Sequence, residues 1–200
     1  MKKILFLLVI LPTFCFAQQY EKLSDEQIDS MFVEMKKEFK ETDTGWEFQK
    51  VIEIKADKND IYNKIIDALA NIYNDSKDVI QEKNKEDGII IAKGFTDSKW
   101  REVNWATVVR NRCWHIIKIE IKDGKYRITL KVNGVEYEDG SNLKFGTEHP
   151  LTGIWPYWKE CKKKHRWHSF NNLRFVYDSS ISVMKEIEDH VKKEPGNDDW

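Results

Sequence analysis

The sequence has few cysteines, no long apolar run and no excess of basic side chains. Three of its 200 residues are cysteine, at positions 15, 113 and 161. The apolar run Ile4–Ile10 is soon followed by Pro12, well short of the about 20 residues that span a bilayer as a helix. We therefore expect that the start of the chain is not a transmembrane anchor.

That same start has the three parts of a secretory signal. Lys2 and Lys3 give a charged beginning, the apolar run follows, and Cys15-Phe16-Ala17 is a small-x-small ending before Gln18. We expect residues 1–17 to be a signal peptide, cleaved between Ala17 and Gln18, and the mature protein to be periplasmic or extracellular. The alternative is a lipoprotein anchored at Cys15, against which the bulky Phe14 counts.

The charge balance bears on the partners of the mature chain. Cleavage removes Lys2 and Lys3 and leaves 31 basic and 34 acidic side chains, a formal charge of −3. Domains that neutralise several phosphates usually carry a basic face, so we expect no nucleic-acid partner. The remaining 183 residues suit one domain. Their many aromatic side chains favour a globular protein over a disordered one.

The first segment of the mature chain is predicted to be helical. Ser24 to Gln27 has the spacing of a capping box. Apolar residues then recur at three- and four-residue steps up to about Glu41, namely Ile28, Met31, Phe32, Met35 and Phe39. We interpret residues 18–45 as an N-terminal helical appendage. Its apolar stripe needs a partner surface, either on the main domain or on another protein, for instance in a dimer.

From Trp46 onward the pattern alternates between strands and helices. A strand precedes a helix capped by Asp57, and a hairpin turns across residues 83–87. A second hairpin turns at Asp123-Gly124, and residues 98–110 fit neither period. Residues 134–158 are read as an extended loop with one edge strand at 135–137, before a last helix from Leu173 to Glu194.

This order, β-α-β-β-β-β-α after an N-terminal helix, is typical of an α+β domain. We predict a curved antiparallel sheet with helices packed on one face, formed by residues 46–194 as a single domain. Pro195-Gly196 ends the last helix, so residues 195–200 are expected to be a loose tail.

Several segments between Phe48 and Glu138 resemble a known family. They are Val51–Ile54, Asp60–Lys64, Ser76–Gln81, Glu86–Gly94 and Gly124–Ile128. In these segments the chain is similar to DUF4468, a family of bacterial secreted domains of unknown function with a TBP-like fold. Members often carry a tryptophan late in the first helix, where this chain has Ala70 to Tyr73. The resemblance implies a fold and no activity, and the name of the fold does not imply DNA binding.

Aromatic residues supply the first candidate site. They form a cluster that suits the apolar face of a sugar or a peptide: Trp155, Tyr157, Trp158 and Trp167. The alternative is a satellite cluster that seals the loop against the sheet.

A basic run supplies the second candidate site. It precedes the last helix and suits an anion at the N-terminus of that helix: Lys162, Lys163, Lys164 and Arg166. The alternative is a solvated surface.

The cysteines and histidines offer two further alternatives. Cys113 and Cys161 are candidates for a disulfide, or else a buried small side chain and a surface thiol. Together with three histidines they supply ligands that suit zinc: Cys113, His115, Cys161, His165 and His168. The spacing is not that of a standard zinc finger, and we expect neither a metal nor a cofactor.

The sequence shows no familiar catalytic motif. It has no Gly-x-Ser-x-Gly, no His-Glu-x-x-His and no glycine-rich phosphate loop. Our leading hypothesis is a non-enzymatic envelope module that binds an unknown protein or glycan through its sheet surface or its aromatic loop. The alternatives are a glycan-binding module that uses Trp155, Trp158 and Trp167, and an uncharacterised envelope hydrolase.

Overall fold

The structure, a computed structural model, describes residues 23–73, 79–97, 102–104, 107–109, 111–139, 144–145, 149–150 and 163–193. Its helices are α1 (Asp25–Met35), α2 (Lys58–Ile72) and α5 (Lys163–Lys192). Its longer strands are β2 (Trp46–Glu53), β3 (Ile80–Asn84), β4 (Ile89–Asp97), β7 (Asn111–Lys122) and β8 (Lys125–Asp139). The short strands are β1 (Phe39–Glu41), β5 (Glu102–Asn104), β6 (Thr107–Val109), β9 (Lys144–Phe145) and β10 (His149–Pro150).

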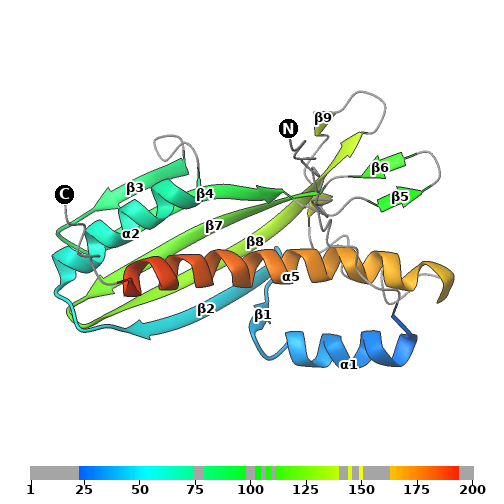
Figure 1. Cartoon of the computed structure of the whole chain (residues 1–200), viewed down its shortest axis with the longest axis horizontal. Coiled ribbons are helices and arrows are strands. Elements are labelled where there is room, and N and C mark those ends of the chain that lie inside the picture. The colour runs from blue at the N-terminus through cyan, green and yellow to red at the C-terminus, as the bar shows by residue number, and fades with distance from the viewer. Residues whose placement is uncertain are drawn as a thin grey trace, which may run out of the picture.

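The main sheet is antiparallel and has the order β1-β2-β8-β7-β4-β3, with β9 and β10 on β8 (Figure 1). Its centre is the hairpin of β7 and β8, which turns at Asp123-Gly124 as predicted. Gly124 has a φ of 75°, a value that glycine adopts without steric cost. This order places β2 beside β8, although the two strands are far apart in the sequence, and Gln49 therefore lies opposite Thr129.

The helices α2 and α5 cover one face of this sheet (Figure 1). Alternate residues of the central strands point toward them and are buried, such as Ile117, Ile119, Ile128 and Leu130. As predicted, Asp57 caps α2, because its carboxylate accepts from the backbone N–H groups of Asn59 and Asp60 at 2.8 and 2.9 Å. The α+β architecture predicted from the sequence is therefore confirmed.

The N-terminal segment departs from the predicted single helix. The capping box at Ser24 is present, but α1 ends at Met35, and Phe39–Glu41 is a strand beside β2. The prediction of a helix to about Glu41 was wrong because Phe39 stacks on Trp46, with ring centroids 4.1 Å apart. Pairing with β2 therefore outweighs the helical spacing of that residue. The apolar stripe of α1 lies on α5, with Ile28, Phe32 and Met35 buried in the common core.

Two boundaries near the end of the chain also differ from the predictions. Residues 135–137 form no separate edge strand, because they continue β8 and pair with β7 beyond a register shift at Trp114 and His115. The last helix begins at Lys163 and not near Leu173. Its first turns carry polar and basic side chains that helical apolar spacing cannot detect. In the part of the chain that is described, no helix is both long and apolar enough to cross a membrane.

Candidate functional site

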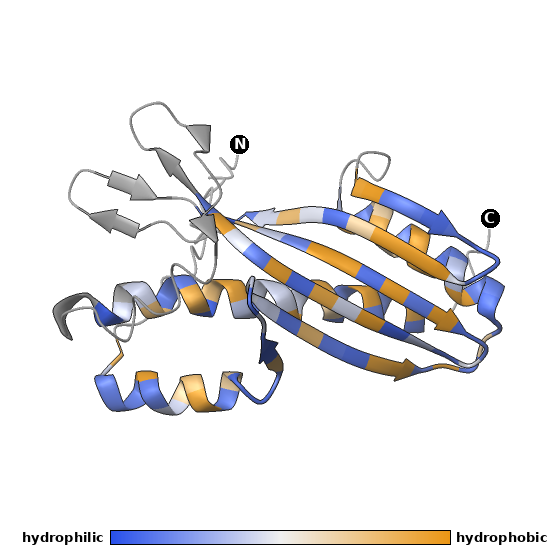
Figure 2. Ribbon diagram, turned by 180° about the vertical axis from the view of Figure 1, so that it is seen from behind, coloured by the Kyte–Doolittle hydropathy of each residue, from blue (hydrophilic) through white to orange (hydrophobic). Residues whose placement is uncertain are grey.

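The sheet face opposite the helices carries no described element, and we call it the open face (Figure 2). Strand alternation directs one side chain in two onto it. On β4 and β7 these include four large apolar side chains: Ile91, Phe95, Trp114 and Ile116. Phe95 is 38 % exposed and the other three are half-buried, so the open face carries an apolar cluster that solvent reaches.

Two cations frame this cluster. Phe95 and Trp114 lie opposite each other on β4 and β7 and meet edge to face, with centroids 5.0 Å apart. The Arg112 guanidinium lies 3.9 Å from the centre of the Phe95 ring, and the Lys93 ammonium lies 5.4 Å from that of Trp114. Arg112 also donates from Nε to Asp97 at 3.0 Å. The cation–π contacts and this ion pair hold the two rings in place.

The other half of the open face, on β2, β8 and the adjoining part of β7, is mainly polar and internally paired. Arg127 donates to Glu120 from Nε and Nη2 at 2.9 and 2.6 Å, and these hydrogen bonds lower the pKa of the Glu120 carboxyl. Lys131 pairs with Glu47 at 3.1 Å. These side chains line a shallow hollow of about 250 Å³ that Ile116 also borders. The open face thus joins an apolar half to a rim of both charges.

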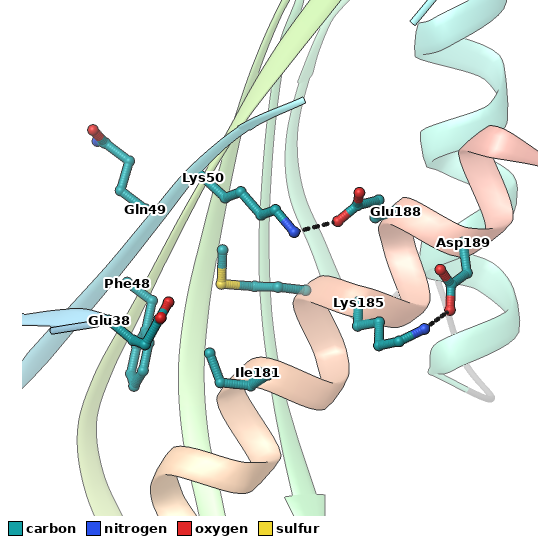
Figure 3. Close-up of a pocket in the computed structure, with 9 residues that line it drawn as sticks. Glu38, Phe48, Gln49, Lys50, Ile181, Lys185, Glu188 and Asp189 are labelled. Atoms are coloured by element: carbon teal, nitrogen blue, oxygen red, sulfur yellow. Dashed lines mark hydrogen bonds and ion pairs between the residues drawn. The ribbon is translucent and has the colours of Figure 1, made fainter. Parts of the chain in front are cut away.

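A second concavity lies between the edge of β2 and α5 (Figure 3). This groove has a volume of about 380 Å³ and an apolar floor formed by Phe48, Ile181 and Met184. Charged side chains border it, and four of them form two ion pairs. Lys50 donates to Glu188 at 2.6 Å, and Lys185 pairs with Asp189.

A titratable pair is buried between α2 and the sheet. Tyr73 and His115 are 7 % and 3 % exposed, and the Tyr73 hydroxyl is hydrogen-bonded to His115 Nε2. Burial lowers the pKa of His115 to about 4, against a hydrogen bond to the Cys113 backbone that raises it. The neutral ring therefore accepts at Nε2 from the Tyr73 hydroxyl, whose own pKa burial raises above its usual range. Both groups are enclosed in the core, where this hydrogen bond satisfies them.

The predicted aromatic and basic sites fall only partly on described residues. Trp167 is half-buried against the core, whereas Trp155, Tyr157 and Trp158 lie outside the described ranges, so the aromatic site stays a prediction. Of the basic run, Lys162 lies outside them, and Lys163, Lys164 and Arg166 belong to α5 itself, not to a segment before it. Arg166 pairs with Asp25 and Asp29 of α1.

The cysteine and histidine predictions also fall only partly on described residues. Cys113 is buried in the core and Cys161 is not among the described residues, so their pairing stays a prediction. His115 of the zinc-type set is bound to Tyr73. The described residues contain no group of three or more potential ligands that could hold a metal. Sequence reasoning missed Phe95 and Trp114 as a pair, although strand alternation places Trp114 on the face opposite the core.

Comparison with known proteins supports the fold. The chain is similar to the crystal structure of a DUF4468 family protein from Bacteroides ovatus, with a TM-score of 0.56 and 14 % identity, covering 78 % of this chain and 94 % of that one. It is also similar to a TBP-like protein from Parabacteroides distasonis, with a TM-score of 0.55 and 12 % identity, covering 78 % and 98 %. No curated protein matches the chain. Residues 48–133 match the model of the family described as a domain of unknown function (DUF4468) with TBP-like fold, so in this segment the chain is similar to that family.

Proposed function

We propose that this chain is an exported, non-enzymatic module that binds an envelope protein through the open face of its sheet. The observation that carries the proposal is the apolar cluster around Phe95 and Trp114 on a face that no described element covers. Exposed apolar patches bordered by polar residues are typical of interaction sites.

The composition of the open face favours a protein partner. Trp, Phe and Arg are enriched at the centres of protein interfaces, and a polar rim surrounds such centres. A glycan would instead stack on flat aromatic faces. Here Phe95 and Trp114 meet edge to face, and Arg112 and Lys93 already lie over their rings. The arrangement therefore offers no pair of coplanar rings to a sugar.

The position of the perturbed titratable groups supports a binding role over catalysis. Tyr73 and His115 have strongly shifted pKa values, and they are buried side by side in the core. A substrate would have to open the contact between α2 and the sheet to reach them. The charged side chains described on the open face include close ion pairs, such as Arg127 with Glu120.

Export rests on residues 1–17, whose pattern is that of a signal peptide. We expect the protein from envelope or culture fractions to begin at Gln18, as read by mass spectrometry of its N-terminal peptide. Protein that keeps Met1 in the cytoplasmic fraction would contradict export. A lipid-modified N-terminus at Cys15 would support the anchored alternative.

A photoreactive amino acid at position 95 tests the binding surface. In cells of the source organism we expect crosslinked adducts from position 95 and none from position 63, which is exposed on α2 on the opposite side of the sheet. When Trp114→Glu is combined with the photoreactive residue at position 95, the adducts should fall by about tenfold or more. A charge in the apolar cluster removes the binding energy that the cluster contributes. Equal adducts from both positions, or adducts that survive Trp114→Glu, would refute the proposal.

A further inference from the structure

The outer edge of β2 is only partly occupied. β1 pairs with β2 at Trp46, Glu47 and Phe48, and no described strand continues this pairing as far as Glu53. On the β1 side, the Thr42 N–H donates to the Gly45 carbonyl, whereas the Ile54 N–H donates toward β8, to Gly124. Because backbone groups alternate in direction along a strand, Gln49, Val51 and Glu53 direct their N–H and C=O groups away from β8. Among the described residues these groups have no strand partner, and we call this part of β2 the unpaired edge.

The two edges of the sheet are protected to different degrees. At the opposite edge, β3 carries Gln81, Glu82 and Lys83 on its exposed positions and a register shift between Ile80 and Glu82. Charges and irregularities of this kind discourage further strand pairing. β2 also carries exposed polar side chains, at Gln49, Lys50 and Glu53, but it has no register shift along its pairing with β8. Val51 is 57 % exposed at the centre of its free part.

Lys50, in the free part of β2, lies on the face of the strand that faces α5. Lys50 donates to Glu188 on α5 at 2.6 Å, and Figure 3 shows its side chain extended toward that helix. The groove described above therefore lies directly beside the unpaired edge, with Phe48, Ile181 and Met184 as its floor. A strand added to β2 would direct every second side chain into this groove.

One charged side chain that lines the groove, Glu38, differs from the others in its pairing. Lys50 and Lys185 are paired with Glu188 and Asp189, whereas Glu38, at the end nearest β1, has no ion-pair partner among the described residues. Its negative charge contributes to raising the pKa of Tyr177, after the larger effect of burial. The charges lining the groove therefore favour an occupant that places a basic side chain beside Glu38.

We propose that this edge binds an extended peptide segment of a partner protein by strand addition. The segment lies antiparallel to β2 as a continuation of β1, and its backbone pairs with Gln49, Val51 and Glu53. Its alternate apolar side chains enter the groove, and a Lys or Arg at its C-terminal end meets Glu38. This site is separate from the open face, and it stands whether or not the open face binds a protein.

A short synthetic peptide provides the test. The probe is an acetylated Thr-Val repeat of four units that ends in Lys amide, and its binding to the full mature chain is followed by backbone amide shifts in NMR. We expect shifts at Gln49, Val51 and Glu53. N-methylation of the amides that face β2 should weaken binding tenfold or more, because it removes the hydrogen bonds of the added strand.

Three variants separate strand addition from nonspecific adhesion. Val51→Pro removes an outward N–H that the sheet does not use and should reduce binding about tenfold or more, whereas Val51→Thr keeps it and should bind as the natural chain does. Glu38→Lys should weaken the Lys peptide and strengthen one that ends in Glu, without altering the backbone of β2. This charge swap keeps the proposal testable if Val51→Pro does not fold.

Three outcomes would overturn the inference. One is the absence of binding at about 1 mM peptide across a panel of alternating apolar sequences. Another is binding that Val51→Pro and Glu38→Lys leave unchanged. The third is a concentration-dependent dimer, seen by analytical ultracentrifugation and lost in Val51→Pro, which would show that the edge pairs with a second copy of this chain.

Discussion

At the scale of single residues, the Tyr73–His115 pair shows how burial selects a protonation state. A charged imidazole inside the core would lose its hydration, so burial holds the pKa of His115 near 4. The neutral ring accepts at Nε2, and the Tyr73 hydroxyl is the donor beside it. Sequence alternation predicted that His115 faces the core, but its partner lies 42 positions away, and no local pattern identifies it.

The first prediction concerns pH. Because His115 binds a proton more weakly in the folded chain than in the unfolded chain, stability is fully present above the ordinary pKa of 6.5 and is lost as pH falls toward 4. Between about pH 7.5 and about pH 5 the natural chain should lose about 2 kcal/mol of unfolding free energy through this group. Urea unfolding at the two pH values measures the difference.

The matched control for that measurement is His115→Gln. Its amide oxygen still accepts from Tyr73, but the side chain does not titrate in this range. The variant should therefore lose about 2 kcal/mol less than the natural chain over the same interval. An identical pH dependence in both proteins would show that other groups are responsible.

The second prediction concerns the close approach of β4 to Tyr73. A Cβ added at Gly94 would lie 2.5 Å from a ring carbon of Tyr73, so Gly94→Ala must displace the ring. We expect a loss of about 1–3 kcal/mol in unfolding free energy. In a Tyr73→Leu background the added methyl group should cost less, because the ring atoms it would meet are gone. A cost that is equal in both backgrounds would contradict this account.

At the scale of elements, the start of α2 combines a local cap with a distant one. Asp57 accepts from two N–H groups of the first turn, and the Lys58 N–H donates to the Asp123 carboxylate in the turn between β7 and β8 at 2.9 Å. Sequence spacing predicted the role of Asp57. It assigned Asp123 only to its hairpin, because the contact joins segments 65 positions apart.

The third prediction separates these two roles of Asp123. Asp123→Ala removes the acceptor for α2 and weakens the turn, so it should cost about 1–2 kcal/mol in unfolding free energy. Asp123→Asn keeps both an oxygen acceptor and a preferred turn residue, and we expect it to stay within about 0.5 kcal/mol of the natural chain. Thermal unfolding followed by circular dichroism compares them. Equal losses would assign the effect to charge and not to hydrogen bonding.

Element boundaries show where pattern reasoning ends. The interiors of α2, β7 and β8 follow clear periods, and the structure has them as predicted. Phe39 continued a helical stripe in the sequence, yet it pairs with β2 through its contact with Trp46. The candidate sites were the least predictable part, since the Phe95–Trp114 pair depends on which strands are neighbours. The periodicity of a strand does not show which other strand lies beside it in the sheet.

At the scale of the whole molecule, the N-terminal segment belongs to the common core. Ile28, Phe32, Met35 and Phe39 are all buried within it, and Arg166 of α5 pairs with Asp25 and Asp29 of α1. The DUF4468 match begins only at residue 48, so α1 and β1 lie outside the matched segment. The apolar stripe that the sequence left without a partner lies mainly on α5.

The fourth prediction tests how much this addition contributes. A chain that begins at Asp43 loses the burial of four large apolar side chains, and we expect its unfolding free energy to fall by about 5 kcal/mol or more. Val33→Ser, at a residue of α1 that is 59 % exposed, should change it by less than about 0.5 kcal/mol. Urea unfolding compares both with the chain that begins at Gln18. An unchanged midpoint in the shortened chain would make residues 23–41 a dispensable addition.

The strand order has a consequence for the time course of folding. Gln49 and Thr129 face each other across β2 and β8 although 80 positions separate them. A newly made β2 therefore has no neighbour on its inner side until the β7–β8 hairpin exists. Closing so long a loop is entropically costly and slow. The hairpin, whose contacts are local, should act as the nucleus, and β2 should join it in a late step that sets the overall folding rate.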